Sequence, residues 1–135
     1  MQTNSPPLSK NAANVLVAED NPAVREFIVR SLSSAGYVVT AAIDGQQALD
    51  ILAREKFDVL VSDIVMPNVD GIALAMKAVR MVPDLRVVMI SGYAQERLRA
   101  HNLDVLVHKI IAKPFSLEEI CEAVKNALSY SPKTA

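Results

Sequence analysis

"FDVLVSDIVMPNVDG", residues 57–71, begins with a short apolar run that ends on Asp63 and continues into a loop with Pro67 and Gly71. We predict a buried strand over the apolar run and a helix at about 72–80 after the loop. A buried strand followed by a helix is the repeating unit of a parallel sheet with helices on both faces. The acid at the strand end stands where such sheets bind their ligands.

The same alternation of strand and helix extends in both directions from this stretch. Further strands are predicted in "NVLVA" (14–18), "YVVTAA" (37–42), "LRVVMIS" (85–91) and the apolar stretch "DVLVHKIIA" (104–112). Predicted helices cover 22–35, 46–55 and 94–102, and a last helix follows Ser116, where Glu119 completes a capping box. We therefore predict one doubly wound α/β domain over 14–129, with a five-stranded parallel sheet, five helices, and tails at 1–13 and 130–135.

Composition narrows the classes of function. The chain has 135 residues, 51% of them apolar, and a formal net charge of −1. That is enough for one domain, and the balanced charge favours neither nucleic acid nor an anionic membrane as a partner. The polar N-terminus lacks the pattern of a signal peptide, and no segment is apolar over the length of a membrane span. The single cysteine, Cys121, fits the reducing cytoplasm, where we expect the protein to reside.

Charged and hydroxyl side chains stand at the ends of the predicted strands. Glu19 and Asp20 follow the first strand, Asp63 and Ser91 end the third and fourth, and Lys113 follows the fifth. Parallel strands bring these ends to one edge of the sheet, so we expect the side chains to converge. Neighbouring carboxylates repel one another and need a cation, and Mg²⁺ is the hard ion that prefers oxygen ligands. Taken singly, the acidic pair is more typical of a helix cap, and Asp63 or Ser91 of a turn.

A carboxylate beside Mg²⁺, a lysine and a hydroxyl makes a phosphoryl-acceptor site. Asp63 could attack an activated phosphorus and form an aspartyl phosphate. Mg²⁺, Lys113 and Ser91 would then neutralise or hydrogen-bond the terminal oxygens, because phosphoryl transfer depends mostly on positioning and charge stabilisation.

In this order, the motifs "AED" (18–20), "SDIVMPNVDG" (62–71), "MISGYA" (89–94) and "AKPF" (112–115) resemble the receiver domain of two-component response regulators. The resemblance spans residues 14–129 and implies a flavodoxin-like sheet with strand order 2-1-3-4-5. It implies that Asp63 is the phosphorylated residue, and that the Lys113-Pro114 peptide bond is cis. By the same resemblance Glu19, Asp20, Asp63 and the backbone carbonyl of Val65 bind Mg²⁺, Ser91 is the hydroxyl switch residue, and Lys113 binds phosphate.

The sequence departs from the family pattern near the last strand. The family usually has Tyr or Phe three positions before the lysine, a ring that swings inward with the hydroxyl residue, but this chain has Ile110. Leu106-Val107 replaces the Gly-Ala that often precedes that strand. Val65 cannot orient an attacking water, and Tyr93 is placed to shield the phosphoryl group. We therefore expect slow self-dephosphorylation.

The resemblance implies a signalling module rather than an enzyme. A histidine kinase or histidine phosphotransferase would phosphorylate Asp63 and so change the affinity for a downstream protein. We expect a stand-alone chain without a DNA-binding output, acting as a monomer or weak dimer. The expected kinase-docking residues are Val24, Arg25, Ile28 and Phe115.

Other functions stay open on the sequence alone. The chain is also similar to the receiver domain of a hybrid histidine kinase. A phosphorylation-independent adaptor is a further possibility, because Ile110 replaces the usual aromatic reporter. A haloacid dehalogenase type of phosphatase would need a second acid two positions after its nucleophile, where this chain has Val65.

Overall fold

A single parallel sheet forms the centre of the molecule. The computed structural model describes residues 12–92 and 108–129. Five strands are hydrogen-bonded in the order β2-β1-β3-β4-β5, which confirms the predicted topology. The strands are β1 (Asn14–Ala18), β2 (Val38–Ala42), β3 (Val59–Asp63), β4 (Arg86–Ser91) and β5 (Lys109–Ala112).

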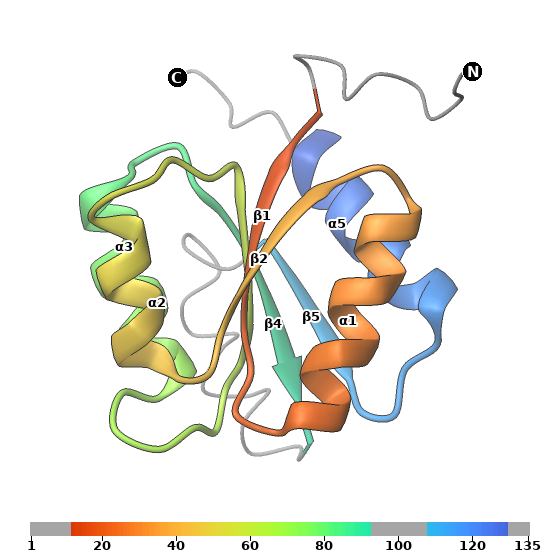
Figure 1. Cartoon of the computed structure of the whole chain (residues 1–135), viewed down its shortest axis with the longest axis horizontal. Coiled ribbons are helices and arrows are strands. Elements are labelled where there is room, and N and C mark those ends of the chain that lie inside the picture. Colours follow the sequence, from red (N-terminus) through yellow and green to blue (C-terminus); the bar gives the residue numbers. More distant parts are fainter. Residues whose placement is uncertain (1–11, 93–107, 130–135) are drawn as a thin grey trace.

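Helices cover both faces of this sheet. In Figure 1, α1 and α5 lie on one face, and α2 and α3 lie on the other. Their bounds are α1 (Pro22–Ser34), α2 (Gly45–Leu52), α3 (Gly71–Met81) and α5 (Leu117–Ser129). The predicted helix at 94–102, the residue Tyr93, and nearly all of both predicted tails lie outside the described residues. Within the described ranges, no helix combines the length and the apolar character needed to cross a membrane.

Side-chain caps determine where the helices begin. Asn21 accepts hydrogen bonds from the backbone N–H groups of Ala23 and Val24 at the start of α1. The predicted capping box of α5 is confirmed, since Ser116 Oγ accepts from Glu119 N at 3.1 Å and Glu119 Oε1 accepts from Ser116 N at 2.8 Å. Each cap satisfies backbone donors that the first helical turn leaves without partners. These caps also fix the loops that lead out of the sheet's carboxyl edge.

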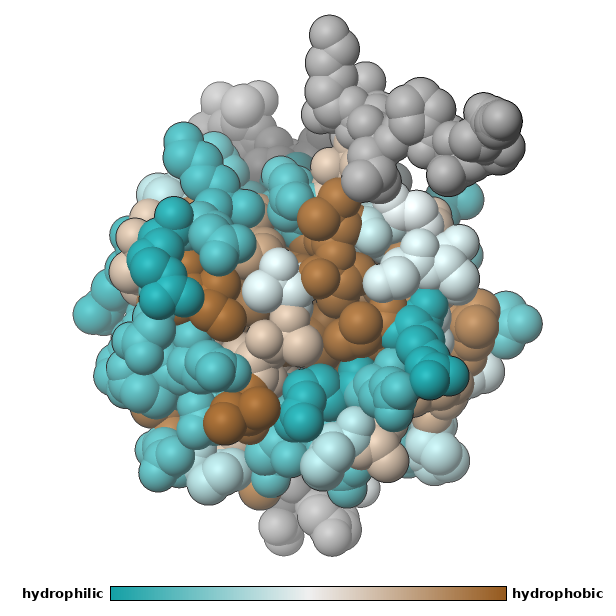
Figure 2. Space-filling model, in the orientation of Figure 1, coloured by the Kyte–Doolittle hydropathy of each residue, from teal (hydrophilic) through white to brown (hydrophobic). Residues whose placement is uncertain are grey.

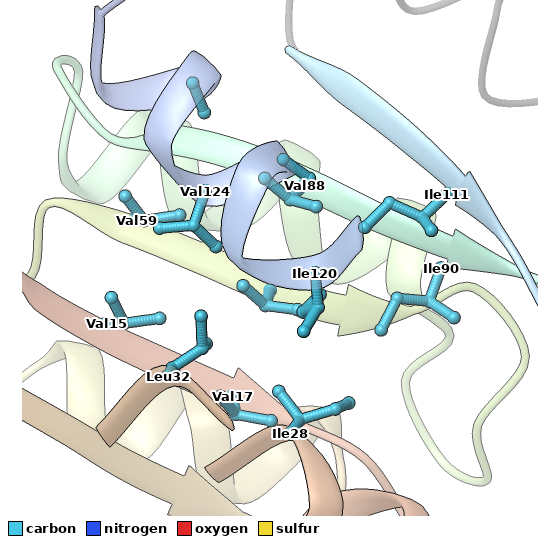
Figure 3. Packing of buried hydrophobic residues seen from close by; sticks show 13 residues of the cluster. Val15, Val17, Ile28, Leu32, Val59, Val88, Ile90, Ile111, Ile120 and Val124 are labelled. Atoms are coloured by element: carbon cyan, nitrogen blue, oxygen red, sulfur yellow. The ribbon is translucent and has the colours of Figure 1, made fainter. Parts of the chain in front are cut away.

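Two apolar layers hold the helices against the sheet. Because strand side chains alternate between faces, neighbouring strand residues enter different layers. Figure 3 shows the layer under α1 and α5, built from Val15, Val17, Val59, Val88, Ile90, Ile111, Ile28, Leu32, Ile120 and Val124. The opposite layer, under α2 and α3, contains Leu16, Leu60, Ile51, Leu52, Leu74 and Ala78.

The outer surface follows from the same amphipathic pattern. Figure 2 shows hydrophilic side chains over the outward faces of the two helices in front, with an apolar strip between them along the edge strand β2. β2 has neutral, mostly small side chains, "VVTAA", and its first three residues are half-buried. β2 therefore carries no charged side chain.

Candidate functional site

The charged residues predicted from the strand ends converge at the carboxyl edge of the sheet, at the bottom of Figure 1. Lys113 Nζ donates a hydrogen bond to Asp63 Oδ2 at 2.7 Å, from the end of β5 to the end of β3. Glu19, Asp20 and Asp63 each offer a carboxylate oxygen, and these atoms all lie within 4.8 Å of one another. The predicted convergence of the three acids and the lysine is therefore confirmed.

Ser91 joins this edge as the last residue of β4. Its side chain is buried, and its backbone oxygen accepts a hydrogen bond from Lys113 N at 2.8 Å. The register of β4 and β5 places Ser91 opposite Ala112, so the lysine follows directly beyond it. The hydroxyl residue and the lysine are thus held through one backbone contact.

Glu19 is the acid whose environment is furthest from water. Only 1% of its surface is exposed. Burial above all, together with the nearby charge of Asp63, raises the pKa of Glu19 from 4.5 to about 7, although a hydrogen bond from Asn21 N opposes this shift. Its Oε2 accepts that bond at 3.1 Å, whereas Oε1 is buried and has no hydrogen-bond partner among the described residues.

A divalent cation fits this group of acids. A buried carboxylate oxygen without a partner is costly, and two further carboxylates nearby add repulsion. Mg²⁺ would relieve both, because it binds carboxylate oxygens and keeps several waters. Glu19, Asp20 and Asp63 are the side chains that would hold it.

Burial and the neighbouring acids shift the pKa of Lys113 in opposite directions. Burial lowers the pKa of Lys113, but its hydrogen bond to Asp63 and the negative charges of Asp63, Glu19 and Asp20 outweigh burial and raise it overall. The ammonium group therefore stays charged at neutral pH. The Lys113-Pro114 peptide bond is cis, as predicted.

The loop after Asp63 packs tightly against the backbone of β3. Gly71 N donates to Ile64 O at 2.7 Å, and a Cβ on Gly71 would overlap the backbone oxygen of Asp63. Asn68 adopts a φ of 71°, and its side chain donates to Asp44 Oδ2 at 3.3 Å. Val65 is 54% exposed on this loop, and its role as a carbonyl ligand stays a prediction.

Ile110, which stands where the family has an aromatic residue, is half-buried. It packs against the cluster that contains Ile64, Ile72 and Met89, on the same face of the sheet as α3. Tyr93 lies outside the described residues, so its shielding role stays a prediction.

An apolar groove runs beside Lys113, between α1 and the loop that follows β5. It encloses about 500 Å³ and is lined by Ala23, Val24, Phe27, Lys113, Pro114 and Phe115, which we call the docking groove. The rings of Phe27 and Phe115 lie 5.9 Å apart. Two of the predicted docking residues, Val24 and Phe115, line this groove.

The prediction for Ile28 is wrong. Ile28 is fully buried against the sheet, so it contributes to the core and is not available to a docking partner. Arg25 also forms a hydrogen bond within the molecule, since its Nη1 donates to the backbone oxygen of Glu19 at 2.8 Å. Sequence periodicity locates a helix face but not its edges, and it carries no signal for a bond from a side chain to a backbone oxygen.

His108 has a structural role that its residue type does not indicate. In the structure its Nδ1 accepts a hydrogen bond from Val87 N at 2.9 Å, and its backbone N donates to Val87 O at 2.7 Å. Burial, with the nearby charge of Arg86, lowers the pKa of the imidazole from 6.5. This residue belongs to the opposite, amino edge of the sheet.

Comparisons with known proteins agree with this geometry. A sequence profile of the response regulator receiver domain matches residues 15–125. The response regulator receiver protein CpdR of Brucella abortus (strain 2308) is 38% identical over 114 residues, which cover 84% of this chain and 95% of CpdR. Sensor kinase CckA of the same organism is 39% identical over 120 residues, or 87% of this chain but only 13% of the kinase.

One solved structure has a relevant ligand. The response regulator TrrA from Thermotoga maritima, crystallised in complex with Mg(2+)-BeF, aligns with a TM-score of 0.77 at 26% identity. The alignment covers 86% of this chain and 99% of that chain.

Proposed function

The chain belongs to the response regulator receiver domain family, and we propose that it accepts a phosphoryl group on Asp63 and signals by changing its contacts with other proteins. The observation that carries this proposal is the meeting of Asp63, Lys113 and a buried acid with an unpartnered oxygen at one edge of the sheet. The group at this edge suits an anion and a divalent cation held side by side.

Phosphoryl transfer can be written in terms of the residues at this edge. A carboxylate oxygen of Asp63 attacks the phosphorus of a phosphohistidine and forms an O–P bond. The N–P bond breaks, its electron pair returns to the imidazole, and the imidazole takes up a proton. Lys113, now 2.7 Å from Asp63, would turn to a phosphoryl oxygen, and the buried Ser91 hydroxyl would donate to another.

Mg²⁺, when bound, neutralises charge that develops on the phosphoryl oxygens. Glu19 and Asp20 would hold the ion beside Asp63, with the Val65 carbonyl as a further ligand. Support comes from the chemistry of these donors and from the Mg(2+)-BeF complex of TrrA.

The phosphoryl donor would bind over the docking groove. The groove is apolar apart from Lys113, which also contacts Asp63, so a partner that covers the groove would bring its histidine toward Asp63 and keep water out. Its lining fits the apolar face of a helix from a histidine kinase or phosphotransferase.

The comparisons offer two settings for this domain, a small regulator and a larger kinase. The match to CpdR spans nearly all of that protein, which supports a single-domain regulator whose output is protein contact. The match to CckA supports a second candidate, the receiver domain of a hybrid sensor kinase.

A phosphotransfer assay tests the proposal. Wild-type protein is incubated with acetyl phosphate and Mg²⁺, and the intact mass is measured. We expect the mass to rise by one phosphoryl group, and we expect neither EDTA-treated protein nor Asp63→Asn to gain it. A matched control is Asp58→Asn, which alters an exposed acid directly before the start of the same strand and should be phosphorylated like wild type.

Two results would overturn the proposal. One is a wild-type protein that is folded and yet gains no mass. The other is an adduct that persists in Asp63→Asn, which would place the phosphoryl group elsewhere.

A further inference from the structure

The corner between β1 and α1 holds Glu19 by its backbone as well as by its side chain. Its backbone N donates to Ala42 O at 3.1 Å, and its backbone oxygen accepts from Arg25 Nη1 at 2.8 Å. Its carboxylate oxygen Oε2 accepts from Asn21 N at 3.1 Å. The remaining oxygen, Oε1, is buried and finds no hydrogen-bond partner in residues 12–92 and 108–129.

Arg25 is itself fixed by the helix from which it extends. It lies in the first turns of α1, and its backbone N donates to Asn21 O at 2.9 Å. Asn21 caps the same helix through its side chain. The guanidinium group therefore links the rigid start of α1 back to the residue that supplies a carboxylate to the acid cluster.

We propose that Arg25 is a positioning residue for the divalent cation. By holding the backbone oxygen of Glu19, it keeps the peptide from rotating, so the free carboxylate oxygen stays close to Asp20 and Asp63 before the ion binds. Groups that orient metal ligands raise affinity because the ligands need no reordering on binding. This inference rests on the proposed metal site of the phosphoryl acceptor.

A purely electrostatic role for Arg25 predicts the opposite effect. A positive guanidinium near a bound cation repels it, so neutralising Arg25 would tighten binding if charge were all that mattered. If positioning dominates, neutralising Arg25 weakens binding. The sign of the change therefore separates the two roles.

Arg25→Met is the main test variant, because methionine keeps an aliphatic side chain but loses every donor. We expect its affinity for Mg²⁺, measured by calorimetry on the whole chain, to fall roughly tenfold. Arg25→Lys keeps the charge and a donor, and should lie between Arg25→Met and wild type. Arg30→Ala is the matched control, since it removes one positive charge from the same helix in an exposed ion pair with Glu26, and it should bind Mg²⁺ like wild type.

Stability measurements keep a merely structural role apart from positioning. If Arg25 only stabilised α1, Arg25→Met would lower the melting temperature equally with and without Mg²⁺ and leave the affinity unchanged, which would overturn the proposal. Tighter binding by Arg25→Met would also overturn it.

The outcome is separable from the phosphoryl-acceptor proposal. If wild type is phosphorylated and Arg25→Met binds Mg²⁺ like wild type, only the positioning role is overturned. Weaker binding by Arg25→Met in a protein that never gains a phosphoryl group supports positioning and overturns the acceptor role alone.

Discussion

The two edges of the sheet use charged side chains in opposite ways. At the amino edge, polar groups are satisfied by backbone: Asp58 Oδ2 accepts from Asn14 N at 2.8 Å, and Arg86 Nε donates to Ala127 O at 3.0 Å. At the carboxyl edge of the described structure, three carboxylates share a small space with Lys113, and Glu19 Oε1 has no hydrogen-bond partner there.

This difference separates stabilising polar groups from functional ones. A buried polar atom without a hydrogen-bond partner costs free energy, so a sequence selected for stability alone would not keep one at a strand end. Sites at which local rules of stability are broken are typically functional sites. The amino edge contributes to the stability of the fold, whereas the carboxyl edge gives up stability that a bound cation would restore.

The largest expected effect comes from Gly71→Ala, which disrupts the backbone packing of the carboxyl edge. The added methyl group would overlap the backbone oxygen of Asp63 and lie 2.9 Å from Ile64 Cα, both buried backbone atoms that cannot move aside cheaply. We expect the free energy of unfolding in urea to fall by about 3 kcal/mol or more.

Gly92→Ala is the control at the same edge. Among the described residues, its new methyl group would meet nothing closer than the Lys113 side chain at 4.0 Å, so we expect the free energy of unfolding to fall by no more than about 1 kcal/mol. Equal stability of the Gly71 variant and wild type would show that the loop has more room than the structure indicates.

The second effect concerns the pH dependence of the carboxyl edge without a cation. Glu19 has a pKa of about 7 in the folded protein against an ordinary value of 4.5, so the folded state keeps a proton that the unfolded chain has released. Stability from this group is therefore present at acidic pH and is lost as the pH rises from about 4.5 to about 7.

Glu19→Gln removes that proton exchange with little change in size. Between pH 4.5 and about 7 in EDTA, the free energy of unfolding of wild type should fall by about 3 kcal/mol more than that of Glu19→Gln. Urea unfolding at several pH values measures this difference. Glu26→Gln, in an exposed ion pair with Arg30, should follow wild type. If stability changes with pH in the same way for wild type and Glu19→Gln, the pKa of Glu19 is not raised in the cation-free protein.

The sequence predicts the positions at the carboxyl edge better than it predicts their contacts. Asp63, Ser91 and Lys113 are predictable because each ends or follows an apolar strand, and parallel strands must bring their ends together. The alternation of apolar strand segments with helices likewise predicts the parallel sheet, and the family resemblance supplies its strand order.

Distances across the fold are harder to predict. Phe27 and Ile28 are adjacent apolar residues of α1, yet Phe27 is 40% exposed and Ile28 is fully buried in the core. The bond from Arg25 to a backbone oxygen and the bond from Val87 to His108 leave no trace in residue type. Both depend on how closely two elements approach.

The smallest effect concerns the amino edge and has the opposite pH dependence. His108 accepts a hydrogen bond from Val87 N and is buried near Arg86, so its pKa in the folded protein lies below 6.5. A group with a lowered folded pKa contributes stability above its unfolded pKa and loses it as the pH falls through the folded value. The contribution of His108 to stability should therefore weaken below about pH 6.5, where the contribution of Glu19 at the carboxyl edge grows.

His108→Leu tests this by leaving Val87 N without the imidazole acceptor. We expect a loss of about 1–2 kcal/mol at neutral pH, shrinking as the pH falls because wild type then protonates and loses the same bond. Urea unfolding across the acidic range measures the difference, and Mg²⁺-dependent phosphorylation of Asp63 should be unchanged. A loss that is constant with pH would mean that the imidazole acts only by packing. A loss of phosphorylation would mean that the two edges are energetically coupled through β4 and β5, and the contrast between them would no longer hold.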